Sequence, residues 1–243
     1  MRQDSSCQPI RDSDLSKGQD FYQSRKYSYE EELRFLHRAL HLEVDRNESV
    51  NNRIYLSNVV RRWPNREVPY TLSCTFDESD RGHIAYSFDE IEKSSCVRFR
   101  PATTDDLDWV HIKSDERGCF ASRGFYGPGF GLHRLNLQRS TCVTKSVIEH
   151  ELLHVLGQGH EQTRPDRDEY MTINWTIMKV NSAHNNWRAS YSEEEAAEYQ
   201  SCYAIVDQPQ ETANFDDCVS ENIVTDYGLP YDWNSIMHYD LYL

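Results

Sequence analysis

The sequence has no long apolar run. No stretch approaches the roughly 18 consecutive apolar residues that a membrane-spanning helix needs. Residues 1–30, which begin Met1-Arg2-Gln3-Asp4, also lack the apolar core of a secretory signal peptide. We therefore expect no membrane span, and no signal peptide is visible in this chain.

Positive charge is scarce as well. The chain has 26 Lys and Arg residues against 40 Asp and Glu residues, and its formal net charge is −14. Proteins that bind nucleic acids rely on basic surfaces to neutralise phosphates, so we do not expect a nucleic-acid partner. The acidic balance favours solubility, whereas a preference for basic substrates would require a localised acidic cleft.

Cysteine, in contrast, is abundant. Seven cysteines are many for a cytosolic enzyme and are typical of a secreted one, in which disulfides persist. The odd number indicates a truncated chain or a free thiol. Two glycosylation sequons, at Asn47 and Asn174, would be used only if the chain is secreted. With 243 residues, the chain can bury one sizeable core.

The most informative segment is His150-Glu151-Leu-Leu-His154-Val-Leu-Gly157-Gln-Gly-His160. Two histidines four residues apart share one face of a helix, so their imidazoles can meet at one zinc ion. Gly157 permits the left-handed turn that ends a helix, and the chain can then bring in His160 as a third ligand. Three unrelated histidines near a core helix are a much poorer explanation of this spacing.

Three nitrogen ligands leave at least one zinc position open, which is the catalytic pattern. Glu151 follows the first ligand directly, beside the place of a water held by the metal. It is predicted to act first as general base and then as general acid. The sequence therefore predicts one catalytic Zn²⁺ and hydrolytic chemistry.

Three blocks resemble the astacin family of metzincin metallopeptidases. They are HELLHVLGQGHEQTRPDRD at 150–168, PYDWNSIMHY at 230–239, and RWPN at 62–65 followed by VPY at 68–70. A glutamate directly after the third histidine, here Glu161, is the mark of astacins within the metzincins. The likeness extends from about residue 51 to residue 239, with one insertion.

The resemblance implies an α+β fold with a metzincin-like two-lobe catalytic domain. Such a domain has a twisted mixed sheet, two long helices, an active-site helix carrying HExxH and a smaller C-terminal lobe below a horizontal cleft. Residues 1–52 would be a partly disordered pro-segment. Residues 53–243 would be a peptidase domain with an incomplete C-terminal lobe and a cysteine-bearing insertion at about 192–226.

The resemblance also implies roles for several residues. Tyr239 would join the zinc and then stabilise the tetrahedral intermediate, and Met237 would lie beneath the metal without binding it. Glu161 would meet the new amino terminus after the pro-segment is removed. His238 and the charged residues at 164–168 are expected to be structural.

Latency is less clearly encoded. In place of the family's Phe-x-Gly-Asp motif the chain has Leu42-Glu-Val-Asp45, which lacks both the phenylalanine and the glycine. Asp45 is the weak candidate for a residue that blocks the zinc in a zymogen. Cys7 is a more remote alternative, because a thiol also binds zinc well. Cleavage near Arg53 would release the pro-segment.

Disulfide assignments come partly from the resemblance. It pairs Cys119 with Cys142, and it matches Cys96 to one half of a bridge whose usual partner lies near the family domain's C-terminus. Cys202 and Cys218 flank a loop and are expected to pair. Cys7, Cys74 and Cys96 have no secure assignment.

Apolar periodicity predicts the main elements. We expect strands at 68–73, 97–99, 109–113 and 132–137, the last of them at a sheet edge with His133 on the surface. We expect helices at 30–42, between 80 and 95, and at 173–187. The zinc helix would begin with a capping box at Ser146–Glu149 or with a cap at Thr141.

Together these features predict a secreted zinc endopeptidase that is made as a zymogen and acts on proteins or peptides. The alternative is a zinc-binding but catalytically incompetent truncated relative. Intact Glu151 and Tyr239 favour the enzyme, whereas the abrupt end of the chain and the unassigned Cys96 favour the alternative. The physiological substrate, the preferred residue after the cleaved bond and the oligomeric state are not encoded in these patterns.

Overall fold

The structure, a computed structural model, describes residues 9–10, 13–17, 19, 62–174, 187–191, 219–224 and 229–239. The chain divides into two compact units. Unit 1 comprises residues 1–43 and 60–156, and unit 2 comprises residues 44–59 and 157–243. Within the described residues, none of the helices combines the length and the apolar character needed to cross a membrane.

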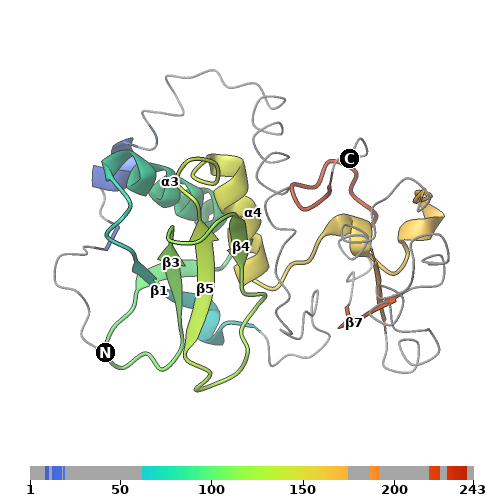
Figure 1. Ribbon diagram of the computed structural model, residues 1–243. Helices are drawn as coiled ribbons and strands as arrows, with labels where there is room; N and C mark the ends of the chain where they lie inside the picture. Colours follow the sequence, from blue (N-terminus) through green and yellow to red (C-terminus); the bar gives the residue numbers. More distant parts are fainter. Residues whose placement is uncertain are drawn as a thin grey trace. The chain divides into compact units, whose positions relative to one another are not determined.

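Unit 1 is built on a five-stranded mixed sheet (Figure 1). Its strands, in the spatial order β2-β1-β3-β5-β4, are β2 (Arg98–Pro101), β1 (Glu67–Leu72), β3 (Trp109–Lys113), β5 (Leu132–Leu137) and β4 (Cys119–Ala121). The first three neighbouring pairs are parallel, and β4 runs antiparallel to β5. A short 3₁₀ turn, η2 (Pro64–Arg66), leads into β1.

Strand β5 corrects a prediction. Its alternating pattern suggested an edge strand, but β5 lies between β3 and β4, and four of its six residues are buried. His133 was expected on the surface, yet its side chain is only 1% exposed. The error arose because the three-residue strand β4 is too short to give a periodic signal, so the strand that covers the edge of β5 was not foreseen.

Helix α3 (Glu78–Ser94) confirms the predicted long helix of unit 1. Asp77 caps its first turn by accepting hydrogen bonds from the amides of Ser79 and Asp80, and the Asp80 carboxylate accepts from the Asp77 amide in return. Ile84 and Phe88 lie on its buried face. Local capping and apolar spacing thus account for both the start of this helix and the face that packs.

Helix α4 (Lys145–Val155) carries the HExxH residues. It begins after Thr144, whose side chain makes no capping hydrogen bond, so neither the predicted capping box at Ser146–Glu149 nor the cap at Thr141 forms. Leu152 and Val155 on this helix are buried. Helices α3 and α4 contact each other, and α4 also contacts β4 and β5, so both helices pack on the same sheet.

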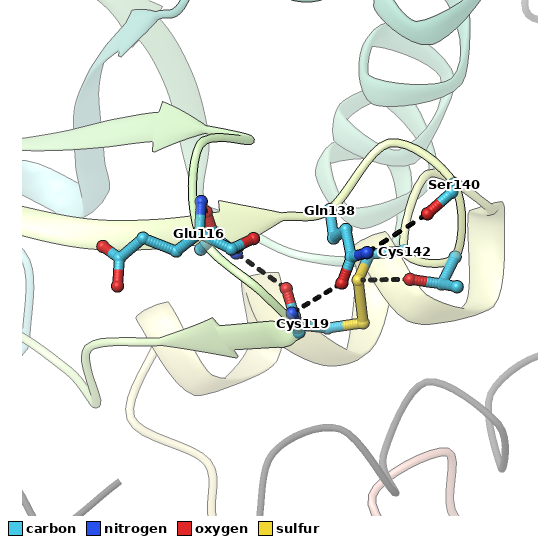
Figure 2. Close-up of a disulfide and its surroundings, with 8 residues drawn as sticks. Glu116, Cys119, Gln138, Ser140 and Cys142 are labelled. Carbon is cyan, nitrogen blue, oxygen red and sulfur yellow. Dashed lines mark hydrogen bonds between the residues drawn. A yellow bond between two sulfur atoms is a disulfide. The ribbon is translucent and has the colours of Figure 1, made fainter. Parts of the chain in front are cut away.

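A disulfide between Cys119 and Cys142 joins β4 to the segment just before α4 (Figure 2), as the resemblance implied. Both cysteines are fully buried, with their Cα atoms 5.7 Å apart. Gln138 extends this connection, because its Oε1 accepts a hydrogen bond from the amide of Gly118, 2.8 Å away. Strand β4 and the start of the zinc helix are therefore held together covalently.

The structure also gives the bonding state of two further cysteines. Cys96 is exposed and free, and Cys74 is disulfide-bonded to a partner outside the described residues. Cys7, Cys202 and Cys218 lie outside the described residues, so the predicted Cys202–Cys218 bridge stays a prediction.

Unit 2 has little regular structure in its described residues. It contains the 3₁₀ turns η3 (Glu161–Thr163) and η4 (Arg167–Glu169), and the strands β6 (Arg188–Ser190) and β7 (Val219–Ile223), which pair in parallel. Strand β7 lies within the cysteine-bearing insertion expected at about 192–226, so this insertion includes regular structure. The predicted helix at 30–42 and most of the one at 173–187 lie outside the described residues.

Candidate metal centre

The structure brings together the three histidines that the sequence proposed as ligands. One ring nitrogen from each of His150, His154 and His160 lies within 4.8 Å of the other two. All three side chains are buried, with at most 5% of their surface exposed. All three candidate ligands in this group are imidazole nitrogens, and none is a carboxylate oxygen. Such a group favours a cation that prefers nitrogen ligands, and three nitrogens at this spacing fit zinc.

This convergence follows from the local course of the chain. The rings of His150 and His154 are 4.6 Å apart on one face of α4, as the spacing of four residues predicts. The helix ends at Val155 with Leu156 as its C-cap, and Gly157 takes a φ of 100°, in the left-handed region that favours glycine. The predicted role of Gly157 at the helix end is thus consistent with the backbone.

Glu151 is the second residue of the motif and is completely buried. A buried carboxylate is costly unless a nearby charge, a hydrogen bond or a proton compensates it. A divalent cation on the neighbouring histidines would supply that charge. The burial of Glu151 directly after the first histidine therefore fits a residue that works next to a bound metal.

Two hydrogen bonds from outside the helix fix the end of α4 in unit 1. The amide of Gly124 donates to the carbonyl oxygen of His154 at 2.9 Å, and Trp63 Nε1 donates to the carbonyl oxygen of Val155 at 2.9 Å. Carbonyl groups in the last turn of a helix have no partner within the helix. The Gly124 amide and the Trp63 indole satisfy two of these carbonyl groups, and one of the two belongs to the proposed zinc ligand His154.

His133 joins the same support. Its ring lies 4.9 Å from that of Trp63, and it also packs against Phe125, Tyr126 and Phe130. His133 Nε2 accepts a hydrogen bond from the Tyr126 amide, so the ring proton is on Nδ1, which faces a carbonyl oxygen. Burial lowers the pKa of His133. A neutral histidine therefore serves as a core residue beneath the loop at 124–131.

The glycine-rich part of that loop is held by one carboxylate. Asp108 accepts hydrogen bonds from the amides of Gly129 and Gly131, at 2.8 and 2.7 Å. Both glycines have positive φ angles, which a residue with a side chain rarely adopts. The loop at 124–131 is consequently held in a defined conformation.

In unit 2, the residues of the predicted Met-turn gather around the third histidine. The ring of Tyr239 lies 4.5 Å from that of His160. The Glu161 amide donates to the carbonyl oxygen of Met237, and the Tyr239 amide donates to Gln162 Oε1 at 3.0 Å. Met237 is fully buried. The positions proposed for the methionine and the tyrosine are therefore consistent with the structure.

Glu161 and Arg164 connect this turn to the segment ahead of it. Glu161 Oε1 accepts hydrogen bonds from the Asp232 amide and from Arg164. Arg164 also pairs with Asp166 and donates to the carbonyl oxygen of Leu229. The charged residues after the third histidine form structural ion pairs, as predicted.

Some contributors were not anticipated. Gln162 lies inside the recognised zinc block, but nothing in the sequence showed that its side chain would hold Tyr239. The contact of Gly124 with His154 spans thirty residues and has no local signal. Asp45 and Arg53, proposed for latency, lie outside the described residues.

Comparison with known proteins agrees with these observations. A family profile described as Astacin, a peptidase family, matches residues 55–207. Zinc metalloproteinase nas-13 of Caenorhabditis elegans is 34% identical over 178 residues, which cover 73% of this chain and 32% of that protein. Low choriolytic enzyme of Oryzias latipes is 29% identical over 184 residues, covering 73% of this chain and 54% of that protein.

A solved structure is similar too. High choriolytic enzyme 1, a hatching enzyme zinc-protease from Oryzias latipes (medaka), aligns with a TM-score of 0.54 at 25% identity, covering 81% of this chain and 77% of that chain. The chain spans about a third of the length of the first nematode relatives that it matches. With the α+β fold and a buried histidine triad that fits one catalytic zinc ion, this chain belongs to the astacin family of zinc metallopeptidases.

Proposed function

We propose that this protein is a zinc-dependent endopeptidase that hydrolyses peptide bonds in proteins. The observation that carries the proposal is the pairing of three convergent histidines with the fully buried Glu151. A purely structural zinc site would usually have four protein ligands and would not need a buried carboxylate beside it.

Zinc, when bound, supplies a Lewis acid that polarises the peptide carbonyl and makes water acidic enough to attack near neutral pH. His150, His154 and His160 would hold the ion through neutral nitrogens. Glu151 would accept a proton from the attacking water while the oxygen of that water forms a bond to the carbonyl carbon of the peptide. When the carbon–nitrogen bond breaks, Glu151 would return that proton to the leaving amine nitrogen.

Tyr239 would provide a second function. Its phenol group can donate a hydrogen bond to the oxygen that gains negative charge as the carbonyl becomes tetrahedral. The support is its ring contact with His160 together with the residue-by-residue match of the segment Ser235–Tyr239. Removal of this donor should lower the rate and leave metal binding intact.

Secretion and zymogen activation are part of the same proposal. The Cys119–Cys142 disulfide is typical of proteins that fold in an oxidising compartment. Residues 1–52 would keep the enzyme latent until cleavage near Arg53, with Asp45 as the candidate for the blocking ligand. If Asp45 blocks the metal, Asp45→Ala should be active without cleavage.

A chelation experiment tests the activity. The purified protein, before and after limited trypsin treatment, would be assayed with a quenched fluorescent peptide and with casein. We expect cleavage after processing, its loss with 1,10-phenanthroline and its return on addition of Zn²⁺. Stoichiometric zinc binding without cleavage of either substrate would instead support a protein that binds zinc but has no peptidase activity.

A further inference from the structure

The turn after the third histidine organises the segment that carries the proposed catalytic tyrosine. Three interactions start from the two residues Glu161 and Gln162. The Glu161 amide donates to the Met237 carbonyl at 2.9 Å, Glu161 Oε1 accepts from the Asp232 amide, and Gln162 Oε1 accepts from the Tyr239 amide. The last of these reaches the backbone of the proposed catalytic residue itself.

The contact between Gln162 and Tyr239 is well placed to be specific. The Gln162 side chain is 1% exposed and that of Tyr239 is 6% exposed, so water is poorly placed to replace Gln162 as acceptor. A buried backbone amide must find a partner in the protein, and here a side chain supplies it. The acceptor oxygen thus determines where the backbone of Tyr239 can lie.

The other backbone polar group of Tyr239 is also held by a side chain. Its carbonyl oxygen lies 2.5 Å from His238 Nδ1, and His238 Nε2 lies 2.7 Å from the Tyr231 hydroxyl. The Tyr231 hydroxyl can donate to Nε2 while Nδ1–H donates to the carbonyl oxygen of Tyr239. Gln162 and His238 together fix both backbone polar groups of Tyr239.

We propose that Gln162 is a positioning residue for Tyr239 and acts on the reaction only through that tyrosine. The inference rests on the proposed function, because it requires Tyr239 to stabilise the transition state. Gln162 lies two residues after His160, so one short turn carries both a proposed zinc ligand and the acceptor that sets the tyrosine against it. Misplacement of a catalytic donor by about 1 Å can cost roughly 100-fold in rate.

The test compares Gln162→Met with Gln162→Glu. Methionine has a similar length but lacks the carbonyl acceptor, whereas glutamate keeps an acceptor oxygen. We expect Gln162→Met to lower kcat by about 10- to 100-fold, with KM and zinc content close to those of the wild type. Gln162→Glu should recover a substantial part of the loss.

Gln138→Met is the matched control. Gln138 also accepts a backbone hydrogen bond through its side-chain oxygen, from Gly118, but lies beside the Cys119–Cys142 disulfide (Figure 2). The same substitution there should leave kcat unchanged. If Gln138→Met lowered kcat as much as Gln162→Met does, the specific role of Gln162 would be overturned.

A double-mutant cycle with Tyr239→Phe decides whether Gln162 acts through Tyr239. If it does, Gln162→Met should cost little further activity once the hydroxyl is gone. Equal losses in both backgrounds, or wild-type kcat in Gln162→Met, would overturn the inference. If Tyr239→Phe itself keeps the wild-type rate, the role proposed for Tyr239 fails, and the inference fails with it.

A second inference concerns residues 9–10 and 13–17, which contact α3 and β1 within unit 1. Arg81 donates to the Pro9 carbonyl oxygen at 2.5 Å and pairs with Asp14 at 3.2 Å. The Asp14 side chain is fully buried. Lys17 forms an ion pair with Glu78 at the start of α3. The buried Asp14 carboxylate holds the segment around it in place, because detachment of that segment would break the ion pair with Arg81.

Tyr70 on β1 extends the same surface. Its side chain is 4% exposed, and its hydroxyl oxygen receives a backbone hydrogen bond from Ile10. Residues 9–10 and 13–17 thus contact the sheet and the start of α3, far in sequence from the proposed cleavage site at Arg53. We infer that these residues keep the N-terminal segment attached after the chain is cut, so that cleavage near Arg53 does not bring about the release that the family resemblance suggested.

The experiment uses the full chain with a recognition sequence for a site-specific protease inserted after Val50. Cys74→Ser is included throughout, because Cys74 is disulfide-bonded and could link the fragments covalently. After cleavage, size-exclusion chromatography shows whether the N-terminal fragment co-elutes with the remainder. We expect co-elution in this background and dissociation with Arg81→Ala or with the milder Asp14→Asn.

Arg139→Ala is the control, because Arg139 pairs with Asp77 and Asp80 at the same end of α3. It should retain the fragment. Dissociation in the parent background would overturn the inference. Retention in both Arg81→Ala and Asp14→Asn would also overturn it, because the Arg81–Asp14 pair would then not be what holds the segment.

Discussion

The indole Nε1 of Trp63 donates a hydrogen bond to the carbonyl oxygen of Val155, 2.9 Å away and 92 residues later in the chain. Trp63 belongs to the RWPN block that marks the start of the family domain, and Val155 is the last residue of the zinc helix α4. The RWPN block is thus hydrogen-bonded to the helix that carries His150 and His154.

Substitution of Trp63 tests this bond. Trp63→Phe keeps an aromatic ring against Phe125 and His133 but leaves the buried Val155 carbonyl without its donor. We expect the free energy of unfolding to fall by about 1–3 kcal/mol, measured by urea denaturation. Trp233→Phe is the control, because Trp233 is 45% exposed, and it should cost much less. Equal effects of the two substitutions would contradict this role for Trp63.

The zinc site was predictable because its information is local. Two histidines four residues apart on a helix, a glycine at its end and a third histidine soon after all lie within eleven residues of sequence. Backbone geometry alone then brings the side chains together. The positions of Met237 and Tyr239 came instead from the family resemblance, since nothing in their own spacing implies a contact with His160.

The errors share a different cause. His133 looked like a surface residue because its strand alternates, and its burial depends on β4 and the aromatic loop, which lie elsewhere in the sequence. The start of α4 was misjudged because Thr144 adopts the cap position without using its side chain. Tertiary contacts decided the burial of His133, and local patterns report neither feature.

His133 gives a pH-dependent prediction. Burial lowers its pKa, so the folded state binds a proton more weakly than the unfolded state. Below the unfolded pKa of about 6.5 the unfolded chain therefore takes up more protons, and stability should fall as the pH drops from 7 towards the lowered folded pKa. His133→Gln should reduce this slope. Urea denaturation between pH 7 and 5 would measure it, and an unchanged slope would contradict the neutral buried histidine.

Metal content tests the ligand set. We expect one zinc per wild-type chain after extensive dialysis. Far less zinc should remain in His160→Ala, because two histidines on one helix are too few ligands for tight binding. His238→Ala is the matched control and should keep the metal, since His238 bonds Tyr231 and the Tyr239 carbonyl instead. Full occupancy in His160→Ala would exclude His160 as a ligand.

Arg164 should be important for the stability of unit 2. Its guanidinium pairs with Asp166 through two hydrogen bonds and also contacts Glu161 and the Leu229 carbonyl. Arg164→Lys keeps the charge but loses the forked geometry, so we expect a loss of about 1–3 kcal/mol. Arg98 donates to exposed backbone carbonyls, so Arg98→Lys should change stability little. If Arg164→Lys left the free energy of unfolding unchanged, the forked hydrogen bonds of the Arg164 guanidinium would contribute nothing to stability.

The activity of Glu151→Gln with its zinc bound tests the proposed peptidase mechanism most directly. Glutamine has nearly the same shape, so the fold and metal content should match those of the wild type, while the group that moves the proton is lost. We expect peptide cleavage by the processed protein to fall by about 100- to 10,000-fold. Activity within a few-fold of the wild type, at equal zinc content, would contradict the claim that Glu151 is the general base of a zinc peptidase.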